Sequence, residues 1–557
     1  MSVFVLEIRK KGHVAGTTPL RDRAIAIGRH PDNDVVIKDD LASRFHCVVE
    51  PHAGGFRLRD LGSRNGTRLN EEKVEVSDLA PGDVIRIGEH AFKFVQKGGV
   101  ARATNARGPR ERRRGRGERG DHAADGAPGA ATPSWAKELQ GMIENLPPKA
   151  ARAERITMVD ANGQASDALS GDALGSLAGR LVLLAASKSR ATDIHLEPRP
   201  DSMHVRMRTD GQMITVTQIP GRVGERLIGL IRIACQLKTA PRDAVLDGHF
   251  SARFTDRRVD YRVSFTPSVH GQKLVLRVLD LRDAPSSLND LGMPRYMVDR
   301  LRKTIHKNQG MMLVCGPTGS GKTTTLYQGM REIDREHRNV VTIEDPVEYH
   351  LEGVTQIPAD IARGNTFGAL LRSVLRQDPD VIFVGEIRDE ETARVAMQAA
   401  MTGHLVFSTV HAKDTMGAVF RLLDLNVERH LVANALDLLL AQRLVRVLCE
   451  NCKRPVKVTP GQASKMGRYL QGADHLYTAT GCAQCLRTGY RGRKALFELL
   501  SFNDELRDIV LERATIASMK KIIEQDLFTT LVQSGYQLVA RGETSLEEAQ
   551  RVVGDGS

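Results

Sequence analysis

The sequence predicts a multidomain protein in which an all-β sandwich is followed by a linker, an α+β domain and a larger α/β domain. Three observations support this order. Short alternating apolar runs separated by turn residues fill positions 1–97, as in β-sandwiches. Arg, Gly, Ala and Pro dominate 98–134, where no apolar period survives, so a disordered tether is expected. From about residue 293, apolar strands alternate with helices, which is typical of a mostly parallel sheet wrapped by helices.

The middle of the chain, residues 135–292, mixes helical and strand-like runs and is predicted to be an α+β domain. Its clearest helical run covers 173–189. The α/β domain spans 293–557, includes a cysteine-rich subdomain at about 446–495, and ends in a helical tail that begins near Asn503. A chain of 557 residues is too long for one hydrophobic core, which agrees with several domains.

Composition narrows the functional classes. Aromatic residues make up 4% of the chain and there is one tryptophan, which argues against a protein that stacks on sugars or bases. No uninterrupted apolar run reaches the ~20 residues of a membrane-spanning helix, and the N-terminus lacks the layout of a signal peptide, so a cytosolic protein is expected. Much of the net charge of +12 lies at 101–120, where it favours solvation or contact with an acidic partner such as anionic lipid. No specific nucleic-acid reader is predicted.

A phosphate-binding loop is the most informative motif. It fits the pattern G-x-x-x-x-G-K-S/T, follows the apolar run Met311–Cys315, and precedes a helical segment, which is the context that the motif requires. Its backbone N–H groups would cradle the phosphates, Lys322 would reach the β- and γ-phosphates, and the Thr323 hydroxyl would hold Mg²⁺. The chain is therefore predicted to bind a nucleoside triphosphate through Gly316, Pro317, Thr318, Gly319, Ser320, Gly321, Lys322, Thr323 and Thr324.

Three further strands end in polar residues that suit hydrolysis. The apolar runs at 381–384, 340–343 and 405–410 lead to Glu386, Glu344 and His411, in that order. For any one of these residues taken alone, a solvated strand end is as good an interpretation as a role in the site. Because the carboxyl ends of parallel strands meet at one sheet edge, the three together with the phosphate loop predict a single site for ATP hydrolysis.

These segments resemble the ATPases of type II secretion systems and of type IV pilus assembly. The family's Walker A box corresponds to Gly316–Thr324, its Asp box to Thr342–Glu348, its Walker B region to Arg376–Asp389, and its His box to Gly403–His411. The likeness covers about 150–557 and implies a hexameric motor with a PAS-like front domain and a RecA-like ATPase domain. It also implies that Glu386 is the catalytic carboxylate, with Glu344, Lys322 and His411 in support. The His box ends here in Val-His-Ala-Lys, where the family usually has Leu-His-Thr-Asn.

The region before the motor adds candidate arginines. Ala191–Pro198 and Val205–Gly211 resemble the second N-terminal domain of these ATPases. In the family, arginines from that domain reach the nucleotide across a cleft, where they would stabilise developing phosphate charge. The resemblance assigns this role to Arg206, Arg208 and Arg262; a solvated strand face is the alternative for each.

Four of the seven cysteines form two C-x-x-C pairs, Cys449/Cys452 and Cys482/Cys485. Each pair can hold a metal from one tight turn, and together they would complete a tetrahedral thiolate shell for a structural Zn²⁺. Two buried, reduced thiol pairs are the alternative. Assembly and secretion ATPases commonly carry such an insert, whereas pilus retraction ATPases lack it. The other three cysteines, Cys47, Cys235 and Cys315, are expected to be core thiols.

The N-terminal segments around Gly28–Arg29, Asn33–Asp39, Ser43–His46 and Asp60–Thr67 resemble a forkhead-associated (FHA) domain. Such domains bind phosphothreonine peptides, and a phosphate group requires cations and several hydrogen-bond donors. His46 is expected to brace the loops, and a sandwich that docks without phosphate is the alternative. The resemblance assigns phosphopeptide binding to Arg29, Ser43, Arg44, Arg64 and Asn65.

The sequence therefore favours an ATP-driven secretion or pilus-assembly motor that is regulated or recruited through phosphothreonine. The expected partners are identical subunits in a hexamer, inner-membrane platform proteins, and a phosphothreonine protein or a threonine of the tether, such as Thr104 or Thr132. We expect it in the cytoplasm, at the inner membrane through its partners. An FHA signalling scaffold with little turnover and a nucleic-acid motor are the alternatives.

Overall fold

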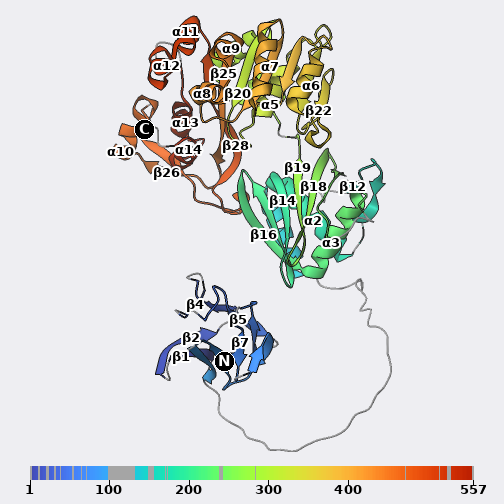
Figure 1. Cartoon of the computed structure of the whole chain (residues 1–557), viewed down its shortest axis with the longest axis vertical. Coiled ribbons are helices and arrows are strands. Elements are labelled where there is room, and N and C mark those ends of the chain that lie inside the picture. The colour runs from blue at the N-terminus through green and yellow to red at the C-terminus, as the bar shows by residue number, and fades with distance from the viewer. Residues whose placement is uncertain are drawn as a thin grey trace, which may run out of the picture. The chain divides into compact units, whose positions relative to one another are not determined.

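The computed structural model of the chain comprises two compact units, Met1–Asp121 and His122–Ser557 (Figure 1). Each unit has its own hydrophobic core and is described by itself. The residues described by the structure are 3–10, 13–20, 24–30, 33–37, 39, 41–52, 55–63, 65–70, 72–88, 90–97, 132–147, 156–169, 171, 173–237, 243–282, 284–470, 472–513, 515–523 and 528–554.

The first unit is a sandwich of two β-sheets. One sheet has the strand order β2-β1-β11-β10-β7-β8 and the other β4-β3-β5-β6-β9. Alternate side chains of both sheets, including Leu6, Ile27, Leu58 and Phe92, are fully buried between them. The strands are β1 Val3–Lys10, β2 His13–Leu20, β3 Ile25–Gly28, β4 Val35–Val36, β5 Cys47–His52, β6 Gly55–Asp60, β7 Thr67–Leu69, β8 Glu72–Val74, β9 Val76–Leu79, β10 Val84–Ile87 and β11 His90–Lys97.

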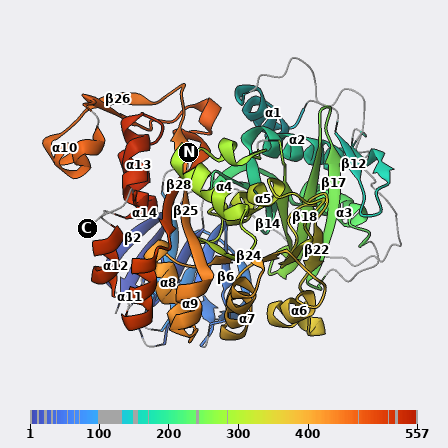
Figure 2. The same ribbon diagram turned by 90° about the horizontal axis from the view of Figure 1, so that it is seen from above.

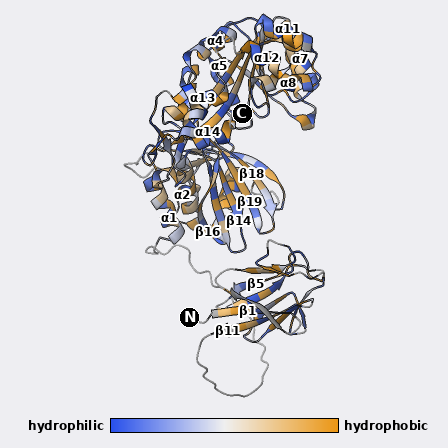
Figure 3. Ribbon diagram, turned by 90° about the vertical axis from the view of Figure 1, so that its left-hand side faces the viewer, coloured by the Kyte–Doolittle hydropathy of each residue, from blue (hydrophilic) through white to orange (hydrophobic). Residues whose placement is uncertain are grey.

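The front part of the second unit is an antiparallel sheet with helices packed against it. The strand order is β13-β12-β17-β18-β19-β14-β15-β16. Apolar residues alternate with polar ones along these strands, and the apolar set packs with α1, α2 and α3 in one core (Figure 3). The elements are α1 Ser134–Asn145, β12 Thr157–Val159, β13 Ala165–Ser166, α2 Leu174–Ser189, β14 Ala191–Pro198, β15 Ser202–Thr209, β16 Gln212–Pro220, α3 Gly221–Ala234, β17 Leu246–Arg253, β18 Arg258–Ser268 and β19 Gly271–Leu279.

The back part is a sheet of order β22-β21-β23-β24-β20-β25-β28, parallel except for β28. Helices α4 and α5 contribute to the core on one face, and α6 to α9 with α11 and α12 to the core on the other (Figure 2). The strands are β20 Gly310–Cys315, β21 Val340–Glu344, β22 Thr355–Pro358, β23 Val381–Val384, β24 Leu405–Val410, β25 Leu436–Leu448 and β28 Tyr490–Ser501. The helices are α4 Arg295–Ile305, α5 Lys322–Arg331, α6 Phe367–Val374, α7 Glu390–Met401, α8 Thr415–Asp424, α9 Arg429–Ala435, α11 Asp504–Arg513, α12 Ile516–Ile523, α13 Leu531–Ala540 and α14 Leu546–Val553.

A small excursion leaves this sheet between β25 and β28. It contains the hairpin β26 Arg454–Lys457 with β27 His475–Thr478, and the short helix α10 Pro460–Met466. The two C-x-x-C pairs lie at its two ends. In the described part of the chain, no helix is both long enough and apolar enough to span a bilayer.

Candidate functional site

The phosphate loop connects β20 to α5 at the carboxyl edge of the parallel sheet. Gly319 and Gly321 have φ angles of 77° and 89°, which favour glycine. A Cβ on Gly321 would lie 2.7 Å from Gln442 Nε2, and one on Gly316 would lie 2.6 Å from the Gln442 carbonyl oxygen. Gly316 is therefore required by its close approach to the backbone of β25, and Gly321 by its backbone angle; a side chain at 321 would also displace the Gln442 amide.

The loop presents polar groups that fit a phosphate. Lys322 Nζ donates to the carbonyl oxygens of Gly316 and Pro317 at 3.0 and 3.1 Å, so it curls over the loop. Burial lowers the pKa of Lys322, and the nearby Glu386 opposes that shift. Ser320 Oγ is buried and has no hydrogen-bond partner among the described residues. A buried hydroxyl and a desolvated ammonium at a helix N-terminus match the oxygens of a nucleotide phosphate.

Glu386 lies at the end of β23 and is engaged by two cationic or ionisable side chains. Its carboxylate pairs with Arg388, and its Oε2 lies 3.4 Å from His411 Nε2 at the end of β24. The Glu386 side chain is 15% exposed, so it is sheltered and still open to the cavity. This geometry suits a carboxylate that orients water.

Glu344, at the end of β21, is held more tightly than Glu386. The residue is 3% exposed, and its carboxylate accepts hydrogen bonds from Tyr327 Oη, Thr342 Oγ1 (2.7 Å) and Gln356 Nε2 (3.1 Å). Burial and the contact with Glu344 raise the pKa of Tyr327, so this phenol stays a donor. Glu344 thus lines the cavity from within a network of protein donors.

One cavity of about 780 Å³ brings these groups together between the front and back parts of the second unit. The phosphate-loop residues Thr318–Thr324 line it with Glu344, Glu386 and His411, as the strand-end pattern predicted. From the front part, the described lining includes Arg190, Arg277 and Arg282, and β28 adds Arg493. None of these four arginines was predicted from the sequence. For Arg277 there is a signal that could have been used, because a charged residue interrupts the apolar run of β19 at this position.

Arg206, Arg208 and Arg262 are absent from the described lining of that cavity. Arg206 pairs with Glu197 at 3.3 Å, and Arg208 donates to the Gly211 carbonyl oxygen at 3.0 Å. Arg262 crosses to the back part, where it contacts the Val347 carbonyl oxygen and lies 3.5 Å from a Glu348 carboxylate oxygen. Their role at the nucleotide stays a prediction.

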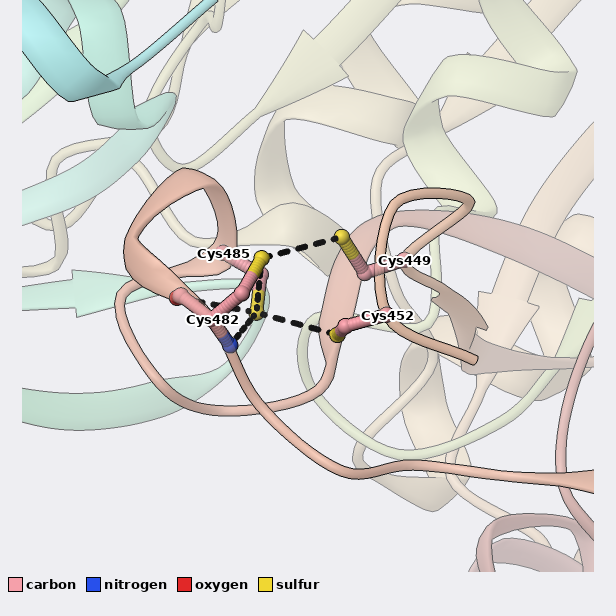
Figure 4. A group of neighbouring side chains, drawn as sticks. All are labelled: Cys449, Cys452, Cys482 and Cys485. Atoms are coloured by element: carbon pink, nitrogen blue, oxygen red, sulfur yellow. Dashed lines mark hydrogen bonds between the residues drawn. The ribbon is translucent and has the colours of Figure 1, made fainter. Parts of the chain in front are cut away.

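The four cysteines of the two C-x-x-C pairs form one cluster (Figure 4). Their sulfur atoms lie within 4.8 Å of one another, with separations of 3.9 Å for Cys449–Cys482, 3.8 Å for Cys452–Cys485 and 3.7 Å for Cys482–Cys485. Four sulfurs at tetrahedral corners, each about 2.3 Å from Zn²⁺, are about 3.8 Å apart. The observed spacing therefore fits zinc.

Hydrogen bonding and charge at the cluster also suit a metal. Burial raises the pKa of Cys449 to about 12. Burial acts in the same direction on Cys482, but hydrogen bonds, first from Asn451 Nδ2 at 3.3 Å, bring its pKa down to about 6. Four thiols this close cannot all ionise without a cation to offset their repulsion. The donor set is thus one that a divalent metal would complete.

In the first unit, the loops expected to bind phosphothreonine are joined by backbone contacts. The Arg29 N–H donates to the Ser43 carbonyl oxygen at 3.0 Å, and Asn65 Nδ2 donates to the Leu41 carbonyl oxygen at 2.8 Å. Arg29, Arg44 and Asn65 are exposed and Ser43 is partly exposed. Four of the five predicted ligand residues therefore lie on adjoining loops; Arg64 lies outside the described residues, as does Thr104 of the tether.

His46 is fully buried beneath these loops. Its Nδ1 accepts the Ser43 N–H at 3.1 Å, so its Nε2 carries the proton and faces the Gly66 carbonyl oxygen at 3.3 Å. Burial lowers the pKa of His46. The structure thus gives His46 the bracing position that the sequence predicted.

Comparison with known proteins finds a matching family model in each of the two units. The family model described as "Type II/IV secretion system protein" matches residues 174–551, and the FHA domain model matches residues 25–88. The chain belongs to the type II/IV secretion system protein family. It carries an FHA domain at its N-terminal end.

Curated relatives and solved structures agree with this family. The type II secretion system ATPase E of Vibrio cholerae is 41% identical over 367 residues, which cover 66% of this chain and 73% of that protein. The type IV pilus assembly ATPase PilB of Myxococcus xanthus is 39% identical over 377 residues, which cover 66% of each. The X-ray structure of the Legionella pneumophila ATPase DotB has a TM-score of 0.50 at 22% identity, covering 67% of this chain and 94% of that one, and shares the fold.

Proposed function

We propose that this chain is an ATP-hydrolysing motor of a type II secretion or type IV pilus assembly system. The observation that carries the proposal is the cavity in which the phosphate loop, Glu386 and His411 converge. The relatives' names, a secretion ATPase and a pilus assembly ATPase, support the same activity.

Each residue at the cavity takes a distinct role in this proposal. The loop N–H groups and Lys322 bind the phosphates, and Thr323 with Glu344 would hold Mg²⁺. Bound Mg²⁺ would neutralise charge on the phosphate oxygens. Glu386 orients and deprotonates the attacking water, and His411 holds the Glu386 carboxylate in place. Arg206, Arg208 and Arg262 remain proposed nucleotide contacts, and the cavity-lining Arg277 and Arg282 join them.

The remaining features of the motor are inferred from the family resemblance. The front part would be PAS-like and the back part RecA-like, with domain limits at about 97, 134 and 292. The working form would be a hexamer in the cytoplasm, held at the inner membrane by platform proteins, with no specific nucleic acid. The tetracysteine cluster would bind a structural Zn²⁺, as its sulfur spacing supports.

The FHA domain would recruit or regulate the motor by binding a phosphothreonine protein. Exposed Arg29 and Arg44 beside Ser43 and Asn65 offer the cations and donors that a phosphate needs. An Arg29→Ala variant of the full chain should lose binding to a phosphothreonine peptide library. Arg57→Ala is the matched control, because it removes an arginine of β6 that pairs with Asp78 of β9. Equal binding by both variants would contradict the proposal.

Steady-state ATP hydrolysis tests the motor itself. The mass of the assembled protein is measured alongside, in the presence and absence of nucleotide, to test the hexamer. Glu386→Gln should reduce turnover by about 100-fold or more, since a positioned base contributes about 10²–10⁴-fold. Glu390→Gln, which removes a surface carboxylate paired with Arg394, should leave turnover unchanged. Nucleotide binding without Mg²⁺-dependent turnover in a zinc-loaded wild type would favour the alternative, a scaffold with little turnover.

A further inference from the structure

Arg443 lies on β25 directly behind the phosphate loop. Its strand pairs with β20, where Ala441 stands opposite Cys315, the residue before the loop. The guanidinium donates Nη1 to the Gln442 carbonyl oxygen at 3.0 Å and Nη2 to the carbonyl oxygens of Ala412, at 3.3 Å, and Lys413. Within the described part of the chain, Arg443 forms no ion pair with a carboxylate. A partly buried cation is thus bound by backbone carbonyls.

Two of the three carbonyls that Arg443 binds, those of Ala412 and Lys413, belong to the loop that follows His411. The chain is also fixed just beyond these residues. Cys315 Sγ donates to the Asp414 carbonyl oxygen at 3.3 Å. Thr415, the first residue of α8, donates to the buried Glu498 carboxylate from its N–H (2.9 Å) and its hydroxyl (2.7 Å). Arg443 holds the two residues that follow His411. Its contacts therefore set where the imidazole meets Glu386.

The same strand also contacts the phosphate loop and the helix after it. Gln442 Oε1 accepts the Thr325 hydroxyl of α5 at 2.7 Å. A Cβ on Gly316 would lie 3.1 Å from Arg443 Nη1, so the guanidinium packs against the first residue of the loop. Residues 442 and 443 thus join the phosphate-binding and the water-orienting halves of the cavity from behind.

We propose that Arg443 is a positioning residue for ATP hydrolysis, which holds the loop carrying His411 against the phosphate loop. The inference rests on the hydrolytic function proposed above. Arg443 acts through backbone carbonyls, because it is absent from the described lining of the cavity. The planar guanidinium reaches three carbonyls from two of its nitrogens, which a single ammonium cannot do in one geometry. Lysine should therefore restore the function only in part.

The test compares full-length wild type with Arg443→Gln, Arg443→Lys and the control Arg429→Gln. Arg429 is an exposed arginine that also donates to a backbone carbonyl, that of Glu512. For each protein we would measure kcat and KM for ATP, the affinity for a fluorescent ATP analogue, and hydrogen exchange of peptides covering 405–415.

For Arg443→Gln we expect kcat to fall about tenfold or more, because small misplacements at a reacting centre cost up to about 100-fold. KM and analogue affinity should stay within about threefold of wild type, and exchange at 411–415 should accelerate. The kcat of Arg443→Lys should lie between those of wild type and Arg443→Gln. Arg429→Gln should match wild type in every measurement. Adding His411→Ala to Arg443→Gln should slow turnover no further than the slower single variant, because both act on one contact.

Unchanged kcat and unchanged exchange at 411–415 in Arg443→Gln would overturn the inference. So would a loss of analogue affinity as large as the loss of kcat, since that would place the effect at the phosphate loop. If Arg443→Gln does not fold, Arg443→Lys decides by the same measurements. A wild type without turnover would contradict the proposed hydrolysis instead, and the exchange of 411–415 would still decide whether Arg443 fixes the loop.

Discussion

His411 Nε2 lies 3.4 Å from Glu386 Oε2, and the two residues follow the neighbouring parallel strands β24 and β23. The imidazole can therefore orient the carboxylate that faces the cavity. We expect His411→Ala to lower kcat by about 10- to 100-fold, as the loss of a group that positions a base, while KM for ATP changes little. Steady-state kinetics with His430→Ala, an exposed histidine on α9, as the control would check this; equal kcat values would contradict it.

Gly321 is required by its backbone angle, and a side chain there would also displace the Gln442 amide. A side chain there would sit at a φ of 89° and 2.7 Å from Gln442 Nε2. The left-handed angle alone costs about 1–2 kcal/mol for other residues. Gly321→Ala should therefore weaken binding of a fluorescent ATP analogue by at least about tenfold. Gly229→Ala in α3, where a Cβ meets open space, should bind like wild type; a Gly321→Ala variant that also binds like wild type would refute the cradle geometry.

The cysteine cluster should hold one zinc ion per chain. Cys482→Ser removes a sulfur that lies 3.7 Å from Cys485 Sγ, so the variant should lose most of its bound zinc and melt at a lower temperature. Metal release measured with a colorimetric chelator, together with thermal denaturation, would show this. Cys235→Ala, which changes a buried thiol outside the cluster, should keep its zinc. Full zinc content in Cys482→Ser would mean that the metal lies elsewhere.

The FHA loops should loosen in mild acid because of His46. Burial lowers the pKa of this histidine below its ordinary value of 6.5, so the unfolded chain takes up the proton first as the pH falls. Neutral His46 therefore contributes to the free energy of unfolding of the FHA domain. This contribution is fully present above about pH 6.5 and declines below it, by at most about 1.4 kcal/mol per pH unit. Hydrogen exchange of peptides covering 41–47, corrected for intrinsic rates, should rise between pH 7.5 and 5.5.

Two variants separate His46 from other groups in that measurement. His46→Gln should flatten the pH dependence of exchange, because no imidazole remains to be protonated beneath the loops. His52→Gln, which changes an exposed histidine at the end of β5, should keep the full dependence. A pH dependence that survives in His46→Gln would assign it to another group.

Local sequence patterns predicted the parts of the site that the chain places at strand ends. Glu344, Glu386 and His411 each follow a short apolar run, and parallel pairing alone brings such ends to one edge. Arg277 and Arg443 could not be found this way. Arg277 lines the cavity because two folded parts meet there, and Arg443 contacts carbonyls about 30 residues away in the chain.

Local composition opposes a strand at two places where the structure has one, β2 and β25. Strand β2 contains Gly16 and Pro19, and lies at the edge of its sheet next to β1. In β25, Leu, Ala, Gln and Arg favour a helix, but pairing between β20 and β28 imposes an extended backbone. Long-range pairing of this kind leaves no mark in the periodicity of the segment itself.

Strand β25 has a consequence for how this chain can vary. It presents Gln442 and Arg443 to the two halves of the nucleotide cavity, donates from Arg446 to Gln212 of the front part at 2.6 Å, and ends next to Cys449 of the cysteine cluster. Shifting an extended strand by one residue turns its side chains to the opposite face. A single residue inserted or deleted between Arg443 and Arg446 would therefore move the contact with the front sheet and the start of the cysteine cluster out of register with the phosphate loop. The excursion between Cys452 and Cys482 is held in place as well, because its Met466 and Leu476 pack in one core with Tyr536 and Val539.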